Sequence, residues 1–166
     1  MKNLIFDLDL TLVDTSALEA SRHHRNWQEA YSLIPHTSLY PGIQEVMNFI
    51  RENNITATVV STSPHPYVQR IVSYYNLPIK FIIGYHDAKP IKPHPAPMLK
   101  ALELMGCPAQ DTISFGDRAI DIQASKAASI QSYACLWGTK EQSLLLNSPY
   151  DQLLRNPLEM IELIKK

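Results

Sequence analysis

The chain has 166 residues, about the length of one domain. Its formal net charge of -1 and pI near 6.6 provide no basic excess, so the composition does not favour general nucleic-acid binding. The apolar run before Asp7 is too short for a signal peptide or a membrane span, and Cys107 and Cys135 follow no ligand spacing. We therefore predict a cytoplasmic protein with reduced cysteines and no membrane partner.

Short apolar runs alternate with segments whose apolar residues recur at helical spacing. The expected strands are residues 3–7, 55–60, 81–83, 113–115 and 131–136. The expected helices are residues 16–34, 43–50, 68–75, 98–105 and 121–128, followed by a C-terminal helix that opens at 156–159. Ser16 and Glu19 have the spacing of a capping box. The alternation predicts an α/β fold, an open parallel Rossmann-like sheet with helices on both faces.

Two carboxylates, Asp7 and Asp9, follow the first expected strand. Side chains at positions i and i+2 of an extended segment share a face, so both could address one reacting centre. Such a pair suits a nucleophile and a neighbouring acid/base, and the same oxygens could hold Mg²⁺. An ordinary structural interpretation is equally open at this point: Asp7 ends a strand and Asp9 opens a turn.

Ligands of an open α/β sheet bind beyond the carboxyl ends of its strands. The polar residues at those ends are Asp7, Asp9, Ser61, Thr62, Gly116, Asp117 and Asp121. Lys92, in a proline-rich loop, would add the positive charge that a phosphate needs, although Lys89 precedes a proline in the same way. A turn or a helix cap is the competing interpretation for Ser61 and Asp117. Together these residues predict a phosphoryl site.

Four segments of the sequence, in order, carry a family resemblance. They are Phe6–Thr15, Val59–Thr62, Lys92-Pro93 and Gly116–Asp121. On these motifs the chain resembles the haloacid dehalogenase superfamily from Asp7 to about Gly138, and within it the phosphatase branch, with motifs similar to those of phosphoglycolate phosphatases. The resemblance implies a sheet order of 5-4-1-2-3, with strands numbered along the chain. An acid at Asp9, where the dehalogenases have tyrosine, favours phosphoryl transfer over carbon–halogen cleavage.

The resemblance also implies catalytic and metal-binding roles. Asp7 would be the nucleophile that becomes an aspartyl phosphate. Asp9 would protonate the leaving oxygen and later deprotonate the hydrolytic water. Mg²⁺ would bridge Asp7, the backbone carbonyl of Asp9 and Asp117.

Other residues would bind the phosphoryl group or support the ligands. Ser61, with Thr62 beside it, would hydrogen-bond a phosphoryl oxygen, and Lys92 would balance the charge there. Gly116 and Asp121 would lie behind the metal ligands, with Asp121 orienting Lys92 or a metal-bound water.

Four positions depart from the family pattern, and two of them, Ser125 and Ser129, occupy places where glycine is common near the fourth motif. Leu10 stands where most relatives have glycine, which would restrict the turn after the second aspartate. Thr62 replaces the asparagine often found beside the hydroxyl of the second motif. None of these changes removes a charged catalytic group.

The segment that would cover the site is short. We expect a single domain over residues 1–166, with a reduced cap inserted at 15–39. A small cap leaves the pocket open and suits hydrolysis of a phosphorylated small molecule or of a larger phosphorylated substrate. His23, His24 and Arg25 could supply substrate contacts from the cap, although a solvated or packed role is the simpler interpretation of these side chains.

The residues and the resemblance together predict a Mg²⁺-dependent phosphomonoester hydrolase that acts through Asp7. A phosphotransferase or mutase of the same fold is the alternative enzyme. A non-catalytic phosphate-binding or interaction module, or an aspartyl-phosphorylated receiver domain, is the alternative from another class. The acid at Asp9 counts against both non-enzymatic alternatives, because neither needs an acid/base beside a nucleophile. The oligomeric state is not predicted.

Overall fold

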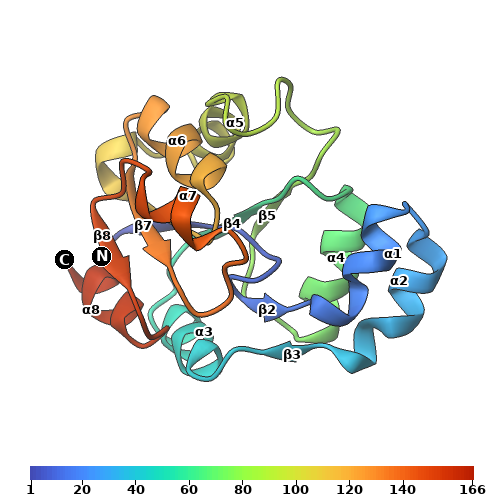
Figure 1. The fold of residues 1–166 in the computed structure, drawn as a ribbon. Helices are drawn as coiled ribbons and strands as arrows, with labels where there is room; N and C mark the ends of the chain where they lie inside the picture. Colours follow the sequence, from blue (N-terminus) through green and yellow to red (C-terminus); the bar gives the residue numbers. More distant parts are fainter.

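The computed structural model of the protein describes residues 1–166 and contains a six-stranded parallel sheet (Figure 1). The strands are β1 (Asn3–Phe6), β4 (Ala57–Val60), β5 (Phe81–Ile83), β6 (Thr112–Gly116), β7 (Gln131–Cys135) and β8 (Gln152–Leu154). Their order across the sheet is β5-β4-β1-β6-β7-β8. The predicted order of the five expected strands is therefore confirmed, and β8 adds a sixth strand that the prediction lacks.

Helices cover both faces of this sheet (Figure 1). One face carries α3 (Ile43–Glu52), α4 (His65–Tyr74) and α8 (Glu159–Lys165). The other carries α5 (Ala96–Met105) and α6 (Ala119–Ala127), and η3 (Ala109–Asp111) and α7 (Gln142–Leu146) complete the helical segments of the core. No helix of the structure has both the length and the apolar character that a membrane crossing requires.

The central strand β1 is buried on both sides. Leu4 and Phe6 pack with the helices of one face and Ile5 with those of the other, because successive side chains of a strand point in opposite directions. The rings of Phe6, Phe115 and Tyr133 stack across β1, β6 and β7, with centroids 5.3 and 5.5 Å apart. Such packing fixes the carboxyl end of β1 and therefore the residue that follows it.

A small helical cap lies between two short antiparallel strands, β2 (Val13–Asp14) and β3 (Ser38–Leu39). It consists of η1 (Ser16–Leu18), α1 (Glu19–His23), α2 (Trp27–Leu33) and η2 (Ile34–His36). Figure 1 shows α1 and α2 side by side next to α4. The small cap of the predicted fold is confirmed; its limits at 15–39 and the single-domain division of the chain stay predictions.

The cap is not the one continuous helix that the sequence predicts. Arg25 has a left-handed backbone (φ 55°) that separates α1 from α2, and Asn26 caps α2 by accepting a hydrogen bond from the N–H of Glu29 (3.2 Å). The predicted capping box at Ser16 is also wrong. The N–H of Ser16 donates instead to Asp14 (3.1 Å), so Asp14 supports the turn that starts the cap.

Candidate active site

Asp7, Asp117 and Asp121 form a cluster of carboxylates at the centre of the sheet, called here the acidic trio. Asp7 directly follows β1 and Asp117 directly follows β6, and the two strands are parallel neighbours, so their carboxyl ends meet. Asp121 joins them from the first turn of α6. One oxygen from each carboxylate lies within 4.8 Å of the others. Two strands and one helix thus bring together residues that are far apart in the sequence.

Lys92 is the cation that balances part of this charge. Its Nζ donates to Asp121 (2.6 Å), to Asp7 (3.1 Å) and to the last backbone carbonyl of β4 (2.9 Å), and the residue is only 3% exposed. Burial alone would lower the pKa of Lys92, but the carboxylates of Asp121 and Asp7 raise it above its ordinary value. Lys89 lies apart, with its ammonium 3.6 Å from the centroid of the Tyr85 ring. Lys92, and not Lys89, is therefore the lysine of the site.

The acidic trio carries more negative charge than Lys92 alone can offset. Burial and the neighbouring Asp121 raise the pKa of Asp7 to about 6. Burial and the charge of Asp7 raise the pKa of Asp117 to about 9, even though Thr11 donates a hydrogen bond to its carboxylate (2.9 Å). Carboxylate oxygens that repel one another at this distance, two of them on buried residues and one on a partly buried residue, suit a hard divalent cation, and the trio could hold a metal ion.

Asp9 lies outside the trio and is held by both the cap and the core. Its carboxylate contacts the hydroxyls of Thr15 (2.7 Å), Tyr67 (2.7 Å) and Ser63 (3.4 Å) and a guanidinium nitrogen of Arg22 (3.1 Å). Burial and the charge of Asp9 raise the pKa of Tyr67, so the phenol keeps its proton and donates it. Asp9 is thus fixed beside the trio without being one of its carboxylates, and its predicted roles in acid/base chemistry and in metal binding stay predictions.

Asp121 connects Lys92 to the start of α6. One oxygen of Asp121 accepts from Lys92, and the other accepts from the N–H of Arg118 (3.0 Å). Gly116 makes room for this carboxylate: a Cβ at that position would lie 2.4 Å from the Cβ of Asp121. A glycine at the end of β6 therefore lets the Asp121 carboxyl approach the sheet.

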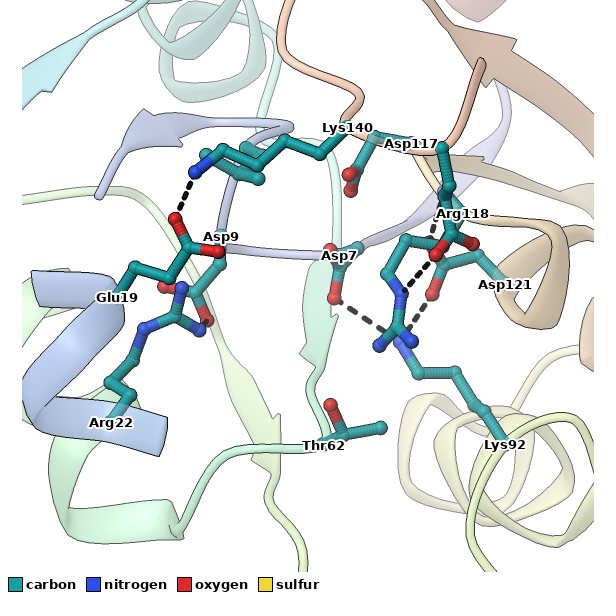
Figure 2. Close-up of a pocket in the computed structure, with 12 residues that line it drawn as sticks. Asp7, Asp9, Glu19, Arg22, Thr62, Lys92, Asp117, Arg118, Asp121 and Lys140 are labelled. Atoms are coloured by element: carbon teal, nitrogen blue, oxygen red, sulfur yellow. Dashed lines mark hydrogen bonds and ion pairs between the residues drawn. The ribbon is translucent and has the colours of Figure 1, made fainter. Parts of the chain in front are cut away.

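The two hydroxyl residues after β4 have different surroundings. Ser61 is buried, and its Oγ accepts a hydrogen bond from the N–H of Ser63 (3.0 Å). Thr62 lines the cavity over the trio (Figure 2). Thr62 therefore faces the site directly, whereas Ser61 supports the turn beneath it, and phosphate binding by either hydroxyl stays a prediction.

The cavity over the acidic trio has a volume of about 270 Å³. Its lining also includes residues that the sequence does not predict for the site, namely Leu10, Glu19, Arg22, Arg118, Lys140 and Glu141. Figure 2 shows Glu19 and Arg22 on the side of the cap and Arg118 on the opposite side, with an ion pair between Glu19 and Lys140. Leu10 and Arg118 lie within the sequence motifs, but Arg22 and Lys140 have no local signal because only the tertiary structure brings them there.

The family model described as haloacid dehalogenase-like hydrolase matches residues 20–135. The chain belongs to the haloacid dehalogenase-like hydrolases. The predicted resemblance to the phosphatase branch is also confirmed. The chain is 28% identical to the pyrophosphatase PpaX of Oceanobacillus iheyensis in an alignment 207 positions long, which covers 99% of this chain and 97% of that protein. It is 31% identical to the phosphoglycolate phosphatase of Escherichia coli over 104 residues, or 61% of this chain.

The chain is shorter than several members of the family that it matches. It spans 41% of the length of the Escherichia coli phosphatase and 65% of a relative from Caldanaerobacter subterraneus. Among solved structures, a hydrolase from Pseudomonas syringae has a TM-score of 0.82 at 18% identity, with 99% of this chain and 98% of that chain covered. CbbY from Rhodobacter sphaeroides, solved in complex with phosphate, has a TM-score of 0.81 at 18% identity over 96% of each chain. These structural matches show the shared fold.

Proposed function

We propose that this haloacid dehalogenase-like hydrolase is a Mg²⁺-dependent phosphatase that acts through an aspartyl phosphate on Asp7. The main support is the position of Asp7: its carboxylate lies at the end of the central strand, against the buried ammonium of Lys92 and within a cavity. A carboxylate is a weak nucleophile in water. A site that holds the carboxylate and the phosphoryl group in a fixed orientation makes the attack effective.

In the first step, an oxygen of Asp7 attacks phosphorus, and the bond between phosphorus and the leaving oxygen breaks. Asp9 gives its proton to that oxygen, so the leaving group departs as an alcohol or as a protonated phosphate. In the second step, Asp9 accepts a proton from water, the water oxygen attacks phosphorus, and the bond to Asp7 breaks. Lys92 stabilises negative charge on the phosphoryl oxygens in both steps. The products are the leaving group, inorganic phosphate and the original protein.

The residues present fit a bound Mg²⁺. Carboxylates of the acidic trio would hold it, with Asp7 and Asp117 as its ligands and Asp121 behind them, and the backbone carbonyl of Asp9 would complete the protein ligands. Burial and the mutual repulsion of these carboxylates raise the pKa values of Asp7 and Asp117, and a divalent cation relieves the repulsion. When bound, Mg²⁺ would neutralise phosphoryl oxygens and so ease the approach of the Asp7 carboxylate.

The relatives indicate a class of substrate. Their names refer to pyrophosphate and to phosphoglycolate, both small phosphorylated acids. We propose that this chain also acts on a phosphorylated small molecule, because its cavity over the acidic trio is only about 270 Å³.

Phosphate release from a panel of phosphorylated small molecules, with Mg²⁺ and with EDTA, tests the proposal. We expect release that requires Mg²⁺ and that Asp7→Asn abolishes without unfolding the protein. Asp111→Asn is the matched control, because Asp111 is exposed and lies before β6, at the opposite end from Asp117. Turnover that survives Asp7→Asn would contradict the mechanism. Release only when an acceptor alcohol is added would favour a phosphotransferase.

A further inference from the structure

A second hollow, of about 550 Å³, opens beside the cavity of the acidic trio. Residues of α1, of the turn before α4 and of the loop after β5 line it. The two spaces have four lining residues in common, namely Glu19, Arg22, Thr62 and Arg118. Because the two spaces adjoin at these residues, one molecule could reach from one into the other.

The lining of this second space is basic. It includes three arginines, two histidines and one carboxylate: Arg22, Arg25, Arg118, His23, His86 and Glu19. The carboxylate of Glu19 is already paired with Lys140. We call this space the basic hollow. Its charge is opposite to that of the acidic trio next to it, so it suits an anionic group rather than a second metal ion.

Arg25 is the lining arginine without a charged partner. Its side chain is exposed and makes no ion pair or hydrogen bond within the protein. Its left-handed backbone (φ 55°) is held in place because its N–H donates to the carbonyl of Arg22 (3.1 Å) and the next N–H donates to the carbonyl of Ser21 (2.8 Å). The backbone of Arg25 is thus fixed, and the five donors of its unpaired guanidinium are available to a ligand in the hollow.

Arg22 lies between the reacting centre and the basic hollow. It lines both spaces, and one of its guanidinium nitrogens contacts Asp9 (3.1 Å), the residue expected to protonate the leaving oxygen. A leaving oxygen near Asp9 would therefore also lie near Arg22, and the rest of the leaving group would have room in the space that Arg25 lines. Figure 2 shows the Arg22 guanidinium beside Asp9, on the side of the cap.

We propose that the basic hollow binds a second anionic group, a carboxylate or a phosphate, on the leaving group of the substrate, with Arg25 as its main cation. This inference rests on the proposed phosphatase function, and it makes Arg25 a specificity-determining residue. The volume of the hollow lies within the range of small-molecule sites. The leaving group is therefore an anionic small molecule rather than an uncharged alcohol.

Three substrates that differ by one charged group test this proposal: phenyl phosphate, 4-carboxyphenyl phosphate and 1,4-phenylene bisphosphate. We expect kcat/KM to be at least about tenfold higher for one or both anionic compounds than for phenyl phosphate. Arg25→Gln should lower kcat/KM about tenfold for the favoured compound and change it less than about twofold for phenyl phosphate. A preference for 4-carboxyphenyl phosphate would identify the second anionic group as a carboxylate, and a preference for 1,4-phenylene bisphosphate would identify it as a phosphate.

Arg70→Gln is the matched control. Arg70 is also an exposed arginine, but it lies on α4 over the ring of Tyr31 (4.2 Å), outside the basic hollow. Equal kcat/KM for all three substrates, or the same change in Arg25→Gln and Arg70→Gln, would overturn the inference while phenyl phosphate turnover still supports the phosphatase.

If none of the three compounds is hydrolysed, the panel of phosphorylated small molecules still decides the proposed function, and binding tests the hollow separately. The probe is 4-carboxyphenyl phosphate titrated calorimetrically into Asp7→Asn protein, with and without Arg25→Gln. A Kd raised about tenfold by Arg25→Gln supports the anion site, and an unchanged Kd overturns it.

Discussion

Asp9 is the residue whose chemistry separates a hydrolase from a phosphate-binding module. We predict that Asp9→Asn lowers kcat by about 10²- to 10⁴-fold, the usual contribution of general acid–base catalysis, while the protein stays folded. With 4-nitrophenyl phosphate, whose leaving group needs little protonation, one equivalent of nitrophenol should be released rapidly before slow turnover. Asp14→Asn is the control, because Asp14 only accepts a hydrogen bond at the start of the cap. If both the rapid release of nitrophenol and the steady turnover are lost, Asp9 is needed before the aspartyl phosphate forms, and the prediction is wrong.

Lys92 has a structural role as well as an electrostatic one. Lys92→Met leaves Asp7 and Asp121 without their buried cation, so we predict that the free energy of unfolding falls by about 3–5 kcal/mol. Lys89→Met, in the same loop but exposed, should change it by less than about 0.5 kcal/mol. Urea unfolding of both variants measures the difference. Similar stability of the two variants would show that the ammonium of Lys92 does not stabilise the fold.

At the scale of elements, Gly116 governs how α6 approaches β6. The Cβ introduced by Gly116→Ala would meet the Asp121 side chain at 2.4 Å, so Asp121 must move. We predict that Gly116→Ala reduces the increase in Tm that Mg²⁺ produces. Gly106→Ala is the control: its Cβ meets nothing within 4 Å, and its positive φ makes it costly for stability alone. An undiminished Mg²⁺ effect in Gly116→Ala would mean that the position of Asp121 does not matter for the metal.

The elements that the sequence predicts correctly have strong and continuous patterns. The apolar runs of β1 and β4 and the helical spacing of α3 are examples, and each is buried where expected. The missed strand β8 has only two apolar residues, Leu153 and Leu154, and it forms because β7 has a free edge beside it. The break between α1 and α2 had a readable signal, since Asn26 and Glu29 have capping-box spacing.

In the candidate site, too, some residues could be predicted from the sequence and others could not. The carboxylates that follow β1 and β6 could be predicted because parallel topology brings strand ends together. The partners of Asp9 could not, because Arg22 reaches it from the cap and Tyr67 from α4, and neither lies in a local motif. Pairing between side chains on separate elements is set by tertiary packing, which leaves no periodic trace in the sequence.

For the whole molecule, the acidic trio links stability to pH. The pKa values of Asp7 and Asp117 are raised to about 6 and about 9, from an ordinary value of 3.8. Between pH 3.8 and about pH 9 the folded protein therefore binds more protons than the unfolded chain. The free energy of unfolding of the metal-free protein should therefore fall as pH rises from about 4 to about 9. Mg²⁺ should raise Tm more at the upper end of this range, because the metal and the protons compete for the same oxygens.

Thermal unfolding in EDTA and in Mg²⁺ across this pH range measures the linkage. Glu19 and Asp87 do not interfere at its upper end, because their pKa values are lowered and both are ionised there. A metal-free Tm that rises steadily between these limits, or a Mg²⁺ effect independent of pH, would contradict the account of the trio.

The most direct test of the central claim is chemical identification of the phosphorylated residue. Asp9→Asn protein is incubated with 4-nitrophenyl phosphate and Mg²⁺, quenched in acid and treated with borohydride, which reduces an aspartyl phosphate to homoserine. Peptide mass spectrometry then locates the change. We expect homoserine at position 7 only, and none when substrate is omitted or when Asp7→Asn is also present. Rapid release of nitrophenol with an unmodified Asp7, or with the modification at another residue, would contradict the central claim.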